Sequence, residues 1–67
     1  MKYINSQISD LIDEHIHSQR DRALMKRNLV DGIHYEPLAE EFKLSAVQVG
    51  RIVRREKQKL FRYVNDT

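Results

Sequence analysis

The sequence holds three groups of residues whose chemistry could serve a function, and the first is a pair of histidines. His15 and His17 lie two positions apart, and imidazole nitrogens are common metal ligands. On a helix, however, residues two apart point about 200° away from each other, so this pair cannot hold one ion. The chain has no cysteine and offers no evident third ligand. We therefore expect no metal site.

The second group consists of three carboxylates on one short segment, Glu36, Glu40 and Glu41. General acid–base catalysis requires a pocket, and a chain of 67 residues has only a small core in which to enclose one. The two glycines stand far apart and form no phosphate-binding loop. We expect no catalytic residue, no cofactor and no enzymatic activity.

The third group is basic and lies in the second part of the chain. Up to Phe42, eight acidic residues outnumber five basic ones, which gives a net charge of −3. From Lys43 to Val64, seven basic residues accompany a single acidic one, Glu56, which gives +6. Clustered Lys and Arg side chains are the usual means of neutralising nucleic-acid phosphates. This part of the chain is therefore expected to bind a polyanion, and a solvated basic face is the alternative.

Apolar spacing predicts the two helices that would position these basic residues. The apolar residues at helical spacing are Leu38, Ala39 and Phe42 in the first helix and Val49, Ile52 and Val53 in the second. Only three residues, 43–45, separate them, which leaves room for a tight turn. We therefore predict a helix-turn-helix over 35–63, whose second helix, 46–63, would enter the DNA major groove. A helical hairpin with no role in nucleic-acid binding is the alternative.

Individual positions support this motif. Ser45, followed three residues later by Gln48, matches a capping box at the start of the second helix. Ala39 is small where the two helices must cross closely. Lys43 stands where the turn often carries Gly at positive φ, at a modest cost in strain.

The remaining sequence predicts two further helices. Segment 6–17 carries Ile8, Leu11, Ile12 and Ile16 at helical spacing and reads as an amphipathic helix. Segment 19–31 follows a Ser18 cap and should end at Asp31-Gly32, because Gly accepts the left-handed conformation that closes a helix. The expected fold is all-α, with four helices in a single domain over 1–67. The stripe on 6–17 packs either into the core or against a second copy in a homodimer, which would suit a palindromic site.

Helical geometry then assigns roles within 46–63. With Val49, Ile52 and Val53 facing inward, Arg51 is the long donor near the middle of the outward face and is assigned a guanine edge. The methyl groups of Ala46 and Val47 suit thymine methyls. The predicted DNA-binding residues are Lys43, Ser45, Ala46, Val47, Gln48, Gly50, Arg51, Arg54, Arg55 and Lys59.

The stretch from Arg20 to Leu60 resembles region 4 of bacterial sigma factors. It is more closely similar to the small sigma-region-4-like proteins of phages and mobile elements of Gram-positive bacteria. The matching features include Asp31-Gly32, Leu38-Ala39-Glu40-Glu41, Leu44-Ser45 and the basic run to Lys59-Leu60. The resemblance implies a recognition helix that reads a promoter element and a neighbouring surface that binds RNA polymerase. Sigma region 4 usually has charged residues just after the turn, where this chain has Ala46 and Val47.

These observations favour a DNA-binding transcriptional regulator or sigma-like accessory factor whose partner is double-stranded DNA. A non-catalytic module that binds RNA polymerase or a phage protein is the alternative. No run of 18 apolar residues is present, and the start of the chain lacks a signal-peptide core, so we expect a cytoplasmic protein with no membrane partner.

Overall fold

Four helices make up most of the computed structural model, which describes residues 5–65, with side chains for 6–63. The helices are α1 (Asn5–His15), α2 (Gln19–Leu29), α3 (Tyr35–Phe42) and α4 (Ala46–Asn65). No strand occurs in this part of the chain, so the predicted all-α class with four helices is confirmed.

The first helix ends two residues before the predicted position, at His15 instead of residue 17. The backbone N–H of Ile16 still donates to the Ile12 carbonyl at 3.0 Å, and the chain then leaves the helical path. Arg22, on the next helix, donates from Nε to the Ile16 carbonyl at 2.7 Å and from Nη2 to the His17 carbonyl at 3.2 Å. Carbonyl groups at a helix end need such outside donors, and here a side chain of α2 supplies them.

The second helix begins at its predicted cap and ends earlier than the predicted 19–31. The Ser18 Oγ accepts a hydrogen bond from the N–H of the third helical residue at 3.3 Å. The helix ends at Leu29, and the N–H groups of residues 30 and 31 both donate to the Lys26 carbonyl, at 2.9 and 3.2 Å. Gly32 follows with a φ of 73°, which is the left-handed conformation predicted for it.

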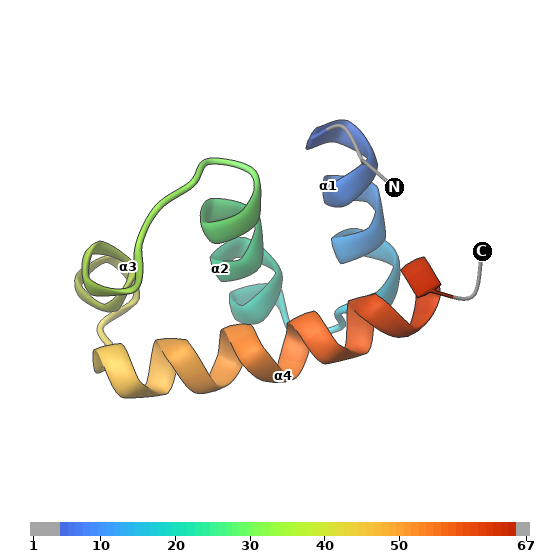
Figure 1. Ribbon diagram of the computed structural model, residues 1–67. Helices are drawn as coiled ribbons and strands as arrows, with labels where there is room; N and C mark the ends of the chain where they lie inside the picture. Colours follow the sequence, from blue (N-terminus) through green and yellow to red (C-terminus); the bar gives the residue numbers. More distant parts are fainter. Residues whose placement is uncertain (1–4, 66–67) are drawn as a thin grey trace.

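The longest helix, α4, lies along one side of the molecule, and the other three helices lie across it (Figure 1). The start of α4 is next to α3, its middle passes beneath α2, and its end lies near α1 (Figure 1). Direct contacts join α4 to all three of the other helices. One face of α4 is therefore the surface on which the rest of the fold is assembled.

Every helix contributes to one apolar core. Its buried members are Ile12, Ile16, Leu24, Met25, Leu38, Ala39, Val49, Ile52, Val53 and Leu60. Ile12 and Ile16 are fully buried, and Ile8 and Leu11 pack partly buried against the same core. Of the two predicted uses of the α1 stripe, the monomer therefore shows the first, packing into the core.

The ends of α1 and α4 meet through two aromatic rings. The His15 and Tyr63 rings stack with their centroids 3.5 Å apart and their planes within 9° of parallel. His15 is the last residue of α1, and Tyr63 lies in the final turns of α4. The stack therefore fastens α1 to the end of α4 that lies farthest from α3.

Ion pairs on the surface link neighbouring helices. Arg27 on α2 donates to both carboxylate oxygens of Glu41 on α3, at 3.1 to 3.2 Å, and to Asp31 at 3.0 Å. The hydrogen bonds to Glu41 and then those to Asp31 raise the pKa of the Arg27 guanidinium. Lys26 pairs with Asp13 on α1 at 2.8 Å. Because these side chains are exposed, the pairs orient the helices more than they stabilise them.

The crossing of α3 and α4 should be sensitive to volume at Ala39, which is only 8% exposed. Ala39→Leu should lower the free energy of unfolding by about 1 to 3 kcal/mol, because the added atoms overpack a closed contact. The matched control is Ala23→Leu at an exposed position of α2, where a change within about 0.5 kcal/mol is expected. Thermal unfolding compares the two, and equal stability of both variants would contradict this placement of Ala39.

The two glycines should respond to alanine in opposite directions. At Gly50, within α4, an added methyl would lie 3.5 Å from Cε2 of Tyr35, an ordinary contact distance. Gly50→Ala should therefore stabilise the protein by up to about 1 kcal/mol through helix propensity. Gly32→Ala should destabilise it by roughly 1 to 2 kcal/mol, because Gly32 has the left-handed φ of 73°. Urea unfolding measures both changes, and a loss of stability in Gly50→Ala would contradict the packing described here.

Candidate nucleic-acid interface

The turn between α3 and α4 fixes where α4 begins. Lys43 adopts the left-handed conformation, with φ 57° and ψ 46°, as predicted for a position that often carries Gly. The N–H of Leu44 donates back to the Ala39 carbonyl at 2.8 Å, which closes the end of α3. Of the described residues other than glycine, Lys43 is the only one with positive φ. The turn is therefore specified by backbone hydrogen bonds, at the cost of strain at one lysine.

The predicted capping box is present at the start of α4. The N–H of Gln48 donates to Ser45 Oγ at 3.1 Å, and Gln48 Oε1 accepts from the N–H of Ser45 at 2.9 Å. Both side chains are exposed, yet their oxygen atoms are engaged in the cap. For a ligand, Gln48 has its amide N–H groups left to offer. The reciprocal bonds hold the first turn of α4 in a fixed orientation.

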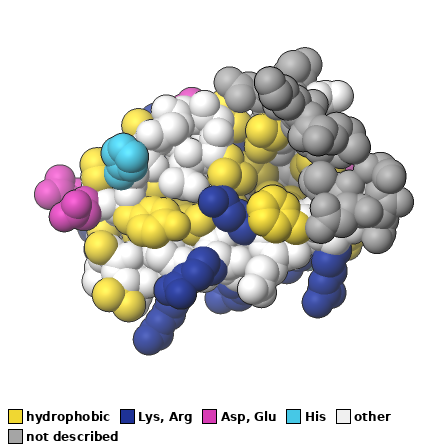
Figure 2. Space-filling model, in the orientation of Figure 1, with side chains coloured by type: hydrophobic (Ala, Val, Ile, Leu, Met, Phe, Trp, Pro, Cys, Tyr) yellow, Lys and Arg dark blue, Asp and Glu magenta, His cyan; other side chains and the backbone are white. Residues whose placement is uncertain are grey.

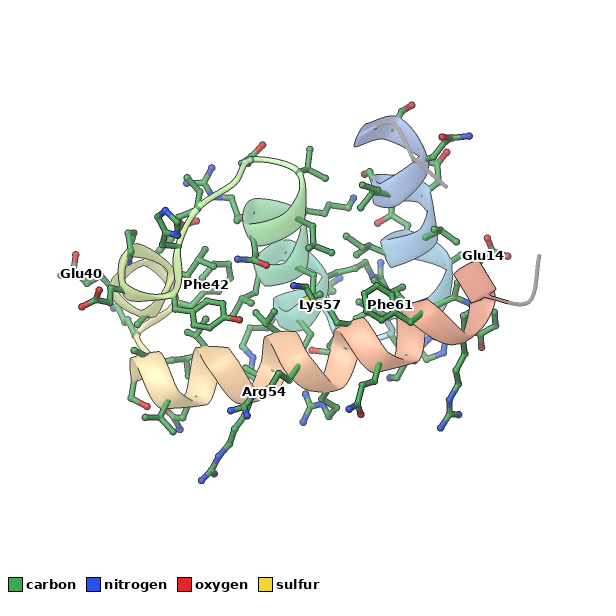
Figure 3. The ribbon with its side chains drawn as sticks, in the orientation of Figure 1. Glu14, Glu40, Phe42, Arg54, Lys57 and Phe61 are labelled. Carbon is green, nitrogen blue, oxygen red and sulfur yellow. The ribbon has the colours of Figure 1, made fainter. Side chains whose placement is uncertain are left out.

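The outward face of α4 contains most of the residues predicted to touch DNA. Val49, Ile52 and Val53 face the core as predicted, which turns Val47, Arg51 and Arg54 to the outside. Ala46 is also exposed, and 63% of Val47 is accessible to solvent. Figure 3 shows Arg54 on the side of α4 away from the other three helices. Its Nε donates to the Gly50 carbonyl at 3.4 Å, so the side chain lies back along the helix.

The prediction that Gly50 faces outward is wrong. Gly50 is buried, and the ring of Tyr35 at the start of α3 covers it. Gly50 is next to the fully buried Val49 and lies at the edge of the face of α4 that packs on the core. The side chain that covers Gly50 belongs to another helix, α3. Because the Tyr35 ring covers it, Gly50 is not available to a groove.

Two of the predicted DNA-binding residues, Arg55 and Lys59, are paired within the protein. Arg55 donates from Nη2 to Asp21 on α2 at 2.8 Å and from Nε to Glu56 at 3.4 Å. Lys59 lies 3.4 Å from the same Glu56 oxygen. Arg55 and Lys59 still have 60% and 43% of their side chains exposed, so they can reach an outside anion while holding these contacts.

Sequence reasoning missed the two carboxylates in this arrangement. Asp21 and Glu56 are only 4% and 2% exposed, although each is a charged residue. The sequence contains a signal that Glu56 is buried, because Glu56 continues the helical spacing of Val49, Ile52 and Leu60 on the buried face of α4. A carboxylate on such a stripe requires a partner. Asp21 lies 34 residues away from Arg55, so the sequence pattern indicates only its role at the start of α2.

Charge divides the surface by element. Figure 2 shows Lys and Arg side chains along the edge formed by α4 and acidic side chains at the end formed by α3. The acidic residues of α3 are Glu36, Glu40 and Glu41, all exposed. Figure 3 shows Glu40 at that end of the molecule, pointing into solvent. An approaching polyanion would therefore be attracted to α4 and repelled from the acidic side of α3.

The two histidines considered as a metal-binding pair lie in different surroundings. His15 is in α1 and stacked on Tyr63, whereas His17 lies outside the helix. Among the residues that the structure describes, no three His, Asp or Glu side chains are placed to hold a metal ion. An open hollow beside the start of α4 is lined by Asn28, His34, Tyr35, Glu36 and Ala46. It brings together one carboxylate and one imidazole, both exposed to solvent.

None of the helices in the described part of the chain combines the length and the apolar character needed to cross a membrane. No protein-family model, curated protein or solved structure matches this chain.

Proposed function

We propose that this protein binds double-stranded DNA, with α3, the turn at 43–45 and α4 acting as a helix-turn-helix. The observation that carries the proposal is the division of α4 into two faces. One face is the core of the fold, and the other presents Val47, Arg51 and Arg54 with no acidic side chain among them. A helix about 10 to 12 Å across fits the major groove, which is about 12 Å wide.

The first turns of α4 are the part that enters the groove. α4 has 20 residues and is therefore about 30 Å long, far more than one groove can accept. α1 meets α4 at the far end through the His15–Tyr63 stack, whereas the capping box leaves the first turns facing solvent. This geometry favours end-first entry, with the residues after Ser45 nearest to the bases.

Arg51 is the residue to which we assign sequence reading. It is exposed, and it makes no hydrogen bond or ion pair with any described residue. Its guanidinium is therefore free to make the bidentate contact with guanine O6 and N7 that discriminates between bases. Val47 and Ala46 offer only methyl groups, which fit thymine methyls. On either side of these base-reading residues are side chains that would hold phosphates, namely Lys43, Gln48 and Arg54.

The biological role that follows is a transcriptional regulator or a sigma-like accessory factor. The order of motifs from Arg20 to Leu60 resembles sigma region 4, and this resemblance supports the role of a sigma-like accessory factor. No catalytic step is part of the proposal.

A protein partner, such as RNA polymerase, is the second candidate, and one observation favours it. Phe61 is 54% exposed on α4, and Figure 3 shows it with Lys57 on a different side of the helix from Arg54. Exposed aromatic side chains are enriched in contacts with other proteins, so the Phe61 ring is the residue that favours this candidate. This surface could be used in addition to the DNA face, because the two lie on different sides of α4.

Arg51→Ala provides the test of sequence reading. Selection from a randomised duplex pool should enrich a defined site for the parent protein, and binding to that site should weaken steeply with salt. Arg51→Ala should lose discrimination at one base pair by about 1 to 3 kcal/mol, roughly 5- to 150-fold in affinity. Lys57→Ala is the control, because the same loss of charge outside the reading face should leave the selected sequence unchanged.

Two results would contradict the proposal. One is the absence of salt-dependent binding to any duplex, which would favour the protein-binding alternative. The other is DNA binding without enrichment of any sequence, which would show that α4 binds polyanions without reading bases.

A further inference from the structure

A nearly buried carboxylate holds two arginines from different helices side by side. Asp21 Oδ1 accepts from Nε of Arg20 on α2 at 3.2 Å, and Asp21 Oδ2 accepts from Nη2 of Arg55 on α4 at 2.8 Å. The Asp21 side chain is 6% exposed, whereas those of Arg20 and Arg55 are 53% and 60% exposed. The Asp21 carboxylate is thus buried, and the guanidinium groups of Arg20 and Arg55 extend from it toward solvent.

A second buried carboxylate extends this arrangement along α4. Glu56, with its side chain 3% exposed, lies 3.4 Å from Arg55 Nε and 3.4 Å from Lys59 Nζ through the same oxygen. Two carboxylates therefore hold three cations, and the surplus positive charge is on the outer side. No buried side-chain nitrogen or oxygen in the described part of the chain lacks a hydrogen-bond partner, so both carboxylates are satisfied from within.

The arginines retain donors that the protein does not use. A guanidinium carries five N–H groups in one plane. Arg20 uses only its Nε, and Arg55 leaves Nη1 without a partner among the described residues. Two like charges held on one carboxylate repel each other, and an outside anion between them would relieve that repulsion. Planar guanidinium groups with free N–H donors bind phosphate oxygens well.

The pair lies next to the proposed reading face. Arg55 follows Arg51 by four residues, which is about 6 Å along the helix and about 40° around it. Arg20 is bound to the same carboxylate as Arg55, so the start of α2 flanks the side of α4 that carries Gln48, Arg55 and Lys59. A helix in the major groove has a sugar–phosphate strand on each side.

We infer that Arg20 and Arg55 together bind the phosphate backbone of one DNA strand, and that Asp21 is the residue that positions them. Arg20 was not among the DNA-binding residues predicted from the sequence. α2 thereby becomes part of the interface instead of serving only as a support for α4. The inference rests on the proposed DNA binding, and it adds both a contact residue and the reason why that contact is ordered in advance.

Arg20→Ala tests the contact. The slope of log affinity against log salt concentration falls by about 0.9 for each phosphate contact that is lost. Arg20→Ala should therefore reduce this slope by about 0.9 on the selected duplex and leave the base preference unchanged. Arg27→Ala is the matched control, because Arg27 is also an exposed, ion-paired arginine of α2, at the end away from Asp21. The control should leave the slope unchanged.

Asp21→Asn separates positioning from simple charge. Removing a negative charge from the protein should by itself leave DNA binding unchanged or strengthen it. Asp31→Asn, which removes an ion-paired carboxylate at the other end of α2, is the control for this effect. If Asp21 positions the two arginines, Asp21→Asn should instead weaken binding several-fold and reduce the salt slope. Thermal unfolding should accompany the measurement, and Arg20→Ala, at an exposed position, gives a second result that does not depend on the stability of a buried site.

The outcomes distinguish this inference from the function on which it rests. If Arg51→Ala changes base preference while Arg20→Ala behaves like Arg27→Ala, DNA reading stands and the inference is overturned. Stronger binding by Asp21→Asn would show that Asp21 acts only as a nearby charge, and it would overturn the positioning role. If the parent protein binds no duplex, both proposals fail together.

Discussion

The fold depends on the burial of one face of α4. Val49 and Val53 are fully buried, and Ile52 and Leu60 are 5% exposed, so the apolar stripe runs along most of the helix. α1, α2 and α3 each lie across this stripe, and their own apolar residues reach the same core. A domain of this size has a small margin of stability, and it cannot give up any part of this face. The opposite face of α4 is therefore the one that remains for an outside partner.

Charge on α4 is arranged by the same constraint. Six of the seven basic residues between Lys43 and Val64 lie in α4, and a helix so rich in one sign repels itself. Glu56, in the buried stripe, and Asp21, from α2, place negative charge beneath this surface and leave the guanidinium groups above it. The Asp21–Arg55 pair thus links α2 to α4, and Glu56 pairs with Arg55 and Lys59 within α4, while the outer surface stays positive. Burial keeps these anions away from an approaching polyanion, although it does not cancel their charge.

Sequence patterns predicted the local features well, because these depend on neighbours in the chain. The left-handed Lys43, the Ser45–Gln48 capping box and the left-handed Gly32 all follow from the chemistry of a few adjacent residues. The ends of α1 and α2 were placed two residues too far along, because Arg22 and the bonds to the Lys26 carbonyl close these helices from outside the apolar pattern. Helix spacing alone could not supply that information.

Sequence patterns could not predict the features that depend on how the helices cross. Gly50 was placed outward because one helix considered by itself leaves it at the edge of the buried face, and only the path of the chain into α3 brings Tyr35 over it. The pairing of Asp21 with Arg55 likewise requires the angle between α2 and α4. The exposed basic face of α4 was therefore predictable from the sequence, whereas the pairing of α2 with α4 through Asp21 and Arg55 was not.

The stack of His15 on Tyr63 joins two residues that lie 48 positions apart in the sequence. It brings the end of α1 onto the last turns of α4, whereas the hydrogen bonds of the 43–45 turn join residues only a few positions apart. Closing a loop between distant residues costs more entropy than closing a short turn. The docking of α1 on α4 is therefore the entropically more costly of the two connections at the ends of α4, and contacts of this kind slow the folding of a chain.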